Sequence, residues 1–177
     1  MSHDEHCGCG HTHGCDCEHD HDHIDISGEP GAFASELSDN QKDFLHQLGH
    51  MHFLPVARFT LSDSREEDFS ITALAPVFIR STGDDMDAVK EAGAFLQGLE
   101  DLGLISLDYD IPLNGYGYEE YKDSEIYRFF CKTVLEGAER PGFLGNTPVL
   151  ELGSIALTDT GEHVSAELCG DDHESHE

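Results

Sequence analysis

The segment DDMDAVKEAGAFLQGLEDLGLISL, residues 84–107, changes clearly from a helical to an extended pattern. Asp84 or Asp85 can cap a first helical turn, and Gly103 can end the helix in a left-handed conformation. Three of the residues 104–107 are apolar, and the four begin a strand immediately after the glycine. The apolar residues of the helical part recur at steps of three and four, which places them on one face; they are Val89, Ala92, Leu96 and Leu99. The segment predicts a helix followed directly by a strand.

Similar signals predict further elements on both sides of this segment. Ser38 and Gln41 form a capping box for a helix at 38–49, in which Phe44, Leu45 and Leu48 fall on one face. Stretches rich in β-branched and aromatic residues predict strands at 56–61 and 69–79, with Pro76 confining the second strand to a sheet edge or a bend. The remaining predictions are a helix at about 123–137, a strand at about 149–157 and a helix at about 160–168. The expected apolar face of the helix at 123–137 consists of Ile126, Tyr127, Phe130, Val134 and Leu135. Together they describe an α+β domain.

Two short strings in this pattern resemble the winged helix-turn-helix superfamily. They are LxxLGLI at 99–105 and LTxxG at 157–161. In that family, the first string ends the recognition helix and starts the wing, and the second closes the wing and begins the last helix. The resemblance covers about 84–168 and implies a winged-helix-like domain at 32–168. Residues 108–148 lie between the two wing strands, so we expect a long helical insertion in the wing.

The two ends of the chain differ from this domain in composition. Residues 1–31 are rich in Cys, His and carboxylates and have almost no aliphatic residues, so we expect a disordered tail and linker. Its candidate metal ligands are Cys7, Cys9, Cys15, Cys17, His3, His6, His11, His13, His19, His21 and His23. Residues 169–177 form a second acidic tail, whose candidate ligands are Cys169, His173 and His176.

These ligands predict binding of a transition metal ion. In each Cys-x-Cys pair of the first tail two thiolates lie one residue apart, and two such pairs can surround a tetrahedral zinc ion. The alternating imidazoles suit zinc, nickel, cobalt or copper(II), so the sequence does not select one metal. In composition the tail resembles the His-rich extensions of nickel and zinc accessory proteins. We therefore expect zinc or nickel as the bound ion.

Other polar and aromatic residues leave two interpretations open. His46 and His50 share one face of the first helix, with His52 just beyond it, and they either complete a metal site or are ordinary surface histidines. Cys131 lies beside two phenylalanines, and we expect a buried, inert thiol. The three aromatic residues of one loop either line a ligand site or pack on the domain; they are Tyr116, Tyr118 and Tyr121.

The charge of the chain limits its partners. It has 177 residues with 37 acidic and 9 basic side chains, a formal net charge of -28. Nucleic-acid binding depends on cations that displace counterions, and the helix at 84–102 has six carboxylates against one lysine, so nucleic acid is not an expected partner. The acidic excess also fits a cytoplasm of high salt content. Without a long apolar run or the apolar core of a signal peptide, we expect a cytoplasmic protein with no membrane partner.

The leading hypothesis is a cytoplasmic transition-metal-binding accessory protein that captures, stores or delivers zinc or nickel. Its winged-helix-like domain would dock a protein partner, and homodimerisation stays open. The alternative is a metal-responsive winged-helix transcriptional regulator that binds DNA, and a third hypothesis is an interaction module without a metal role. Since the chain has no phosphate-binding glycine loop, nucleophile-elbow string or His-Glu-x-x-His motif, we do not expect an enzyme.

Overall fold

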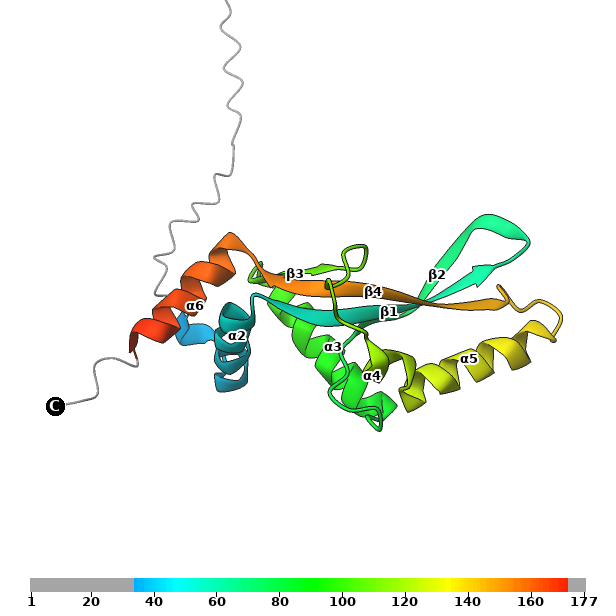
Figure 1. Ribbon diagram of the computed structural model, residues 1–177, viewed down its shortest axis with the longest axis horizontal. Helices are drawn as coiled ribbons and strands as arrows, with labels where there is room; N and C mark the ends of the chain where they lie inside the picture. The colour runs from blue at the N-terminus through cyan, green and yellow to red at the C-terminus, as the bar shows by residue number, and fades with distance from the viewer. Residues whose placement is uncertain (1–33, 172–177) are drawn as a thin grey trace, which may run out of the picture.

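The computed structural model describes residues 34–171, which form an α+β fold around an antiparallel sheet (Figure 1). Within these residues the sheet has four strands in the order β2-β1-β4-β3. The elements are α2 (Asp39–Met51), β1 (Phe53–Asp63), β2 (Glu66–Val77), α3 (Met86–Asp101), β3 (Ile105–Asp108), α4 (Glu119–Lys122), α5 (Glu125–Ala138), β4 (Thr147–Leu157) and α6 (Asp159–Asp171).

Helix α2 begins at the capping box that the sequence predicts. The Gln41 amide donates a hydrogen bond to Ser38 Oγ at 3.3 Å, and the Ser38 amide donates to Gln41 Oε1 at 2.9 Å. These two bonds satisfy backbone donors that the first turn would otherwise leave unpaired. The helix buries Phe44, Leu45 and Leu48 against the rest of the domain, which confirms the predicted apolar face.

Strand β1 lies inside the sheet between β2 and β4. It pairs with β4 over ten residues, from Phe53 opposite Ala156 to Ser62 opposite Thr147. Strand β2 is an edge strand, as Pro76 predicts. Figure 1 shows β1 and β4 as a long twisted ribbon, with the β1–β2 hairpin extending away from α2 and α6.

The two strings that resemble the winged helix family meet in the sheet. Helix α3 is capped by Asp85, whose carboxylate accepts from the Ala88 amide at 2.8 Å, and it leads directly to β3. Strand β3 pairs antiparallel with the end of β4, from Ile105 opposite Leu157 to Asp108 opposite Ser154. The predicted insertion between these strands contains α4 and α5, while β2 precedes α3 along the chain.

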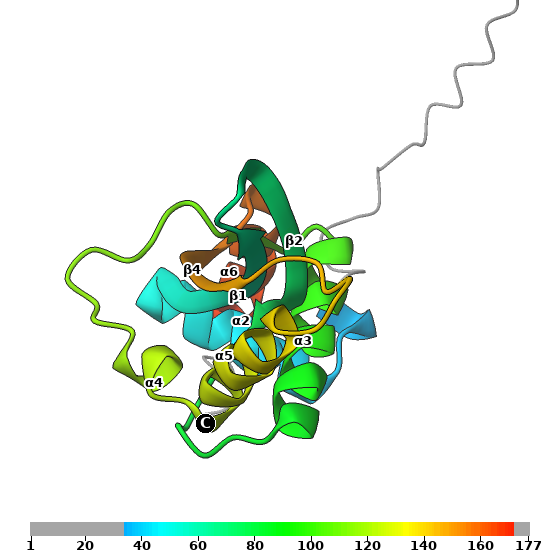
Figure 2. The ribbon, with the colours of Figure 1, turned by 90° about the vertical axis from the view of Figure 1, so that its right-hand side faces the viewer.

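The apolar core consists of two adjoining clusters that β1 connects. The first joins α2, α6, β3 and the second half of α3, and β1 contributes Leu54 and Val56 to it. The second joins α4, α5 and the first half of α3, and β1 contributes Ala57 and Phe59. In the end-on view, α3, α4 and α5 lie on one side of the strands (Figure 2). The first cluster holds helices α2 and α6 together at one end of the sheet.

Two of the three tyrosines of the aromatic loop pack into the domain, and the third, Tyr116, lines a pocket. Tyr118 and Tyr121 are fully buried beside the short helix α4, whereas Tyr116 keeps 39% of its surface exposed. The Tyr118 hydroxyl donates to Gly153 O at 2.7 Å and accepts from the Leu113 amide at 2.8 Å. The Tyr121 hydroxyl donates to Pro55 O at 3.0 Å. Both phenols therefore connect the insertion to the sheet.

Three local predictions need correction. Leu135, predicted on the buried face of α5, is 61% exposed, because that helix contacts the sheet through Ile126, Phe130 and Val134. Cys131 is only partly buried, so its expected full burial is wrong. The last helix continues to Asp171 and does not end at 168. Cys169 therefore lies on α6.

None of the helices within residues 34–171 combines the length and apolar character that a membrane-spanning helix requires.

Candidate metal centre

Most of the predicted metal ligands lie outside the described residues. These are Cys7, Cys9, Cys15, Cys17, His3, His6, His11, His13, His19, His21, His23, His173 and His176. Cys169 is described, and it lies on the last turns of α6. The structure therefore tests the surroundings of this one predicted ligand.

Helices α2 and α6 approach each other closely enough to share a site. The Ser165 hydroxyl on α6 donates to the carbonyl of Leu45 on α2 at 3.2 Å. Gly49 stands one turn further along α2, and its missing side chain leaves room for Ser165. Because α6 follows β4 and α2 precedes β1, the pairing of β1 with β4 brings the two helices to the same end of the sheet.

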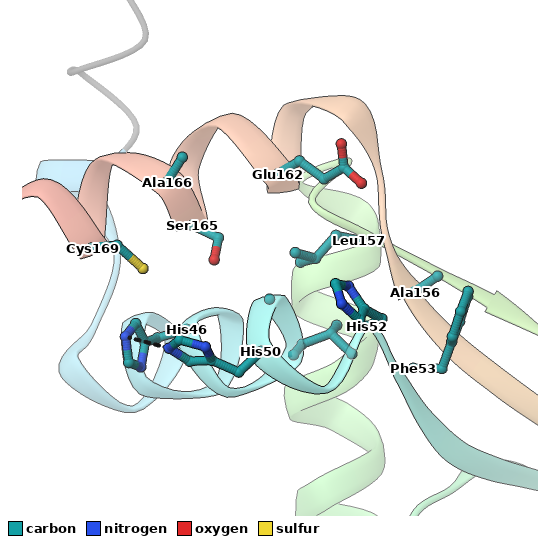
Figure 3. A pocket seen from close by; sticks show the side chains of 12 residues that line it. His46, His50, His52, Phe53, Ala156, Leu157, Glu162, Ser165, Ala166 and Cys169 are labelled. Carbon is teal, nitrogen blue, oxygen red and sulfur yellow. Dashed lines mark hydrogen bonds between the residues drawn. The ribbon is translucent and has the colours of Figure 1, made fainter.

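His46, His50 and Cys169 meet where these helices face each other (Figure 3). The two Nε2 atoms are 3.2 Å apart, and the imidazole rings are nearly perpendicular, with centroids separated by 4.5 Å. One ligand atom from each of the three residues lies within 4.8 Å of the other two. His46 is partly buried, while His50 and Cys169 are exposed. An ion from solvent can therefore reach all three side chains.

The three side chains line a pocket of about 560 Å³ between α2, α6 and the ends of β1 and β4. Apolar side chains including Leu48, Leu157 and Phe53 form part of its wall. Two more potential metal ligands, His52 and Glu162, also line the pocket, but they lie toward the end opposite Cys169 in Figure 3. Among these described lining residues there is no Lys or Arg, so no side-chain ammonium or guanidinium competes with a metal cation.

Titratable groups with shifted pKa values elsewhere in the domain have structural partners. Arg58 on β1 donates to Glu151 on β4, and this hydrogen bond is the main cause that lowers the pKa of Glu151. Thr60 donates to the same carboxylate oxygen at 2.6 Å. Burial raises the pKa of Tyr109 to about 12 and shifts that of Tyr121 upward. These groups stay in one protonation state near neutral pH and support the sheet.

Sequence reasoning identified each member of the centre separately but not the group. The four-residue spacing of His46 and His50 correctly placed them on one helix face. His52 was considered with them, yet its ring is outside the group of convergent ligand atoms. Cys169 was assigned to the C-terminal tail. Its approach to the histidines depends on the packing of α6 against α2, and the spacing of residues along the sequence does not predict this packing.

Comparisons of the chain with protein-family models, characterised proteins and solved structures give no match. The sequence, the fold and the geometry of the centre are therefore the basis for a functional proposal.

Proposed function

We propose that the protein is a cytoplasmic accessory protein that binds zinc or nickel and captures, stores or delivers it. The observation that carries this proposal is the meeting of His46, His50 and Cys169 from opposite ends of the folded chain. Two imidazoles and a thiolate are donors that transition metals prefer, and magnesium and calcium prefer oxygen. The four cysteines and seven histidines of residues 3–23 add ligands of the same kind.

A protein partner is the second part of the proposal. Met51, Phe53 and Ile111 expose 57%, 54% and 59% of their surfaces and line a second pocket next to the metal centre. Phe53 lines both pockets. Exposed apolar side chains that gather around a concave surface are typical of interaction sites. A partner that docks there would reach the pocket that contains the centre from its Phe53 end.

We also propose that the domain is related in architecture to winged helices. The order of α3, β3, β4 and α6, with β3 and β4 antiparallel, supports this proposal. A DNA-binding regulator is the less favoured function. The charged side chains on the exposed surface of α3 are Asp87, Lys90, Glu91 and Asp101, a set with excess negative charge. Such a surface repels phosphates.

Metal analysis of the full chain tests the proposal. The protein is prepared reduced and without oxygen, equilibrated with zinc or nickel against a weak chelator, and analysed for bound metal. We expect tight uptake by the wild-type chain. Uptake should fall in a tail-thiol variant, in which Cys7, Cys9, Cys15 and Cys17 are replaced by serine, and should not change in Cys131→Ser. A wild-type chain that retains neither metal contradicts the proposed function.

A further inference from the structure

We propose that His46, His50 and Cys169 form one tetrahedral zinc site with three protein ligands and an open fourth position that faces the pocket. This inference rests on the proposed function and makes it more specific, because it names the metal, the ligands and a coordination position that can exchange. It also separates this site on the folded domain from the Cys/His-rich segment near the N-terminus.

The distance between the imidazoles fits a shared ion. Two nitrogens bound to one zinc ion at about 2.0–2.1 Å with tetrahedral angles lie about 3.3 Å apart. The Nε2 atoms of His46 and His50 are 3.2 Å apart. Without metal, this separation corresponds to a hydrogen bond in which one imidazole donates from Nε2 and the other accepts. If the donating ring shifts that proton from its Nε2 to its own Nδ1, with no net loss of a proton, both Nε2 atoms present lone pairs to one cation.

The thiolate needs only a small movement to complete the group. In a tetrahedral site a zinc-bound sulfur, at about 2.3 Å from the ion, lies about 3.6 Å from each nitrogen ligand. The ligand atoms of the three residues are all within 4.8 Å of one another. Cys169 is exposed on α6 and borders the pocket, which leaves space for a side-chain rotation of this size. Figure 3 shows its sulfur directed toward the two rings.

Both helices that carry the ligands are fixed by the core. Leu45 and Leu48, on the buried face of α2, have no exposed surface. Helix α6 is held by the buried Val164 and by the hydrogen bond from Ser165 to α2. The ligands therefore start near their bound positions, and binding orders few additional groups.

The ligand set and its arrangement favour zinc over nickel. Nickel(II) prefers square-planar or octahedral surroundings, whereas sulfur and nitrogen donors in a tetrahedral arrangement are typical of zinc. The nearly perpendicular imidazoles come from successive turns of one helix, and the thiolate approaches from a second helix. Donors that approach from two helices in this way are compatible with a tetrahedral ion.

The fourth coordination position opens into the pocket. Within residues 34–171, no further Cys, His, Asp or Glu atom joins the three convergent ligands. The pocket of about 560 Å³ has room for water or a small donor molecule beside the ion. Zinc sites with three protein ligands keep a position of this kind for water or an incoming ligand. An ion held in this way can pass to a competing ligand without unfolding the domain.

Cobalt(II) is the spectroscopic probe for this site, because its tetrahedral thiolate complexes absorb visible and near-ultraviolet light. We would titrate cobalt into the full-length tail-thiol variant, which retains Cys131 and Cys169 as its cysteines. The expected result is one tetrahedral cobalt ion with a sulfur-to-cobalt charge-transfer band, displaced by one equivalent of zinc. Adding Cys169→Ser should remove the band, while adding Cys131→Ser should leave it intact.

The histidines and the open position have separate readouts. In the same background, His46→Ala and His50→Ala should each weaken cobalt binding at least tenfold, while far-ultraviolet circular dichroism without metal stays unchanged. An added small thiol should increase the charge-transfer band by occupying the fourth position; no change would contradict an open position. A band that survives Cys169→Ser, or a square-planar nickel complex preferred to zinc, overturns the tetrahedral zinc site.

The outcomes distinguish this inference from the proposed function. If the wild-type chain binds metal and the tail-thiol variant gives no sulfur-to-cobalt charge-transfer band, the site on the domain is wrong and the accessory function stands. If the wild-type chain binds no metal, both are wrong.

Discussion

Gly49 of α2 lies so close to Ser165 of α6 that a β-carbon at position 49 would stand 2.3 Å from the serine Oγ. The same β-carbon would be 3.4 Å from the serine Cβ, an ordinary contact distance. The obstacle is therefore the hydroxyl and not the helix backbone. His50 follows Gly49 and Cys169 is one turn beyond Ser165, so this contact lies next to two of the three proposed metal ligands.

We predict that Gly49→Ala weakens both the domain and its metal centre. Alanine favours a helix over glycine by up to about 1 kcal/mol, but here the clash with Ser165 must separate the helices or rotate the hydroxyl. The free energy of unfolding should fall by about 1–2 kcal/mol in urea titrations, and cobalt affinity should fall with it. Adding Ser165→Ala removes the obstructing oxygen but also its hydrogen bond to Leu45 O, so it should restore both properties only in part.

Gly98→Ala is the matched control. Gly98 also lies in a helix, α3, but a β-carbon there has no neighbour within 4 Å among the described atoms. This substitution should raise the free energy of unfolding by about 0.5–1 kcal/mol. If Gly49→Ala stabilises the protein equally, the close contact between α2 and α6 has no energetic importance.

Zinc should stabilise the folded domain through the proposed site. A ligand that binds only the folded state at 100 times its dissociation constant adds about 2.7 kcal/mol to the free energy of unfolding. We expect zinc to raise the unfolding temperature of the tail-thiol variant, and excess chelator to reverse the increase. Cys169→Ser in that background should abolish most of this shift. An identical shift in both proteins would place the stabilising zinc elsewhere.

The capping box of α2 contributes to stability in a way that the sequence already predicts. Ser38→Ala removes the acceptor for the Gln41 amide and should lower the free energy of unfolding by about 1 kcal/mol. Ser38→Asp retains an acceptor and should have a much smaller effect, so the pair of variants isolates the cap. Equal losses in both variants, measured by urea unfolding, would show that another property of Ser38 matters.

Tyr118→Phe removes only one oxygen atom but should lower the stability of the domain strongly. The hydroxyl satisfies Gly153 O and the Leu113 amide, and the ring is buried, so its removal leaves two backbone groups without this partner. A buried group left unsatisfied costs about 1–3 kcal/mol. Calorimetry should show a clear fall in unfolding temperature. Tyr116→Phe, at a partly exposed ring of the same loop, should change it little.

The ion pair between Arg58 and Glu151 predicts a pH-dependent contribution to stability. The hydrogen bond from Arg58, aided by that from Thr60, lowers the pKa of Glu151 in the folded state. A carboxylate with a lowered pKa stabilises the fold above its unfolded pKa of about 4.3, and this contribution disappears as pH falls through the folded value. Glu151→Gln should therefore be less stable than wild type at pH 7, by less than about 1 kcal/mol because the pair is partly exposed.

Urea titrations at several pH values and constant ionic strength measure this difference. It should decrease as the pH is lowered from 6 toward 3. A difference that grows under acid conditions would contradict the assigned direction of the pKa shift.

Local signals were sufficient for most of the helices and strands. Ser38, Asp85 and Ser124 all cap helices where the sequence predicts helix starts, because capping depends on residues three positions apart. Leu135 was misplaced because helical periodicity identifies an apolar face but does not show how wide a face the sheet covers. The short helix α4 was not predicted, since it depends on the buried contacts of Tyr118 and Tyr121.

The candidate centre is only partly predictable, because one helix contains two of its residues and distant contacts position the third. The spacing of His46 and His50 is a property of one helix, so the sequence contains it. Cys169 joins them only after β1 has paired with β4 and α6 has packed on α2. Its position depends on distant contacts, and it appeared in the sequence as one more ligand near the C-terminus.

The central position of β1 has a consequence for the order in which the chain can fold. β1 can form a hairpin with β2 as soon as both are synthesised. The backbone groups on its other edge stay unpaired until β4 has been synthesised. Partners so distant in sequence make folding slow, because the entropy of loop closure is lost before the contacts form. We expect a nascent chain that still lacks β4 to expose the apolar side chains of β1, so that ribosome-bound intermediates depend on chaperones until the last strand emerges.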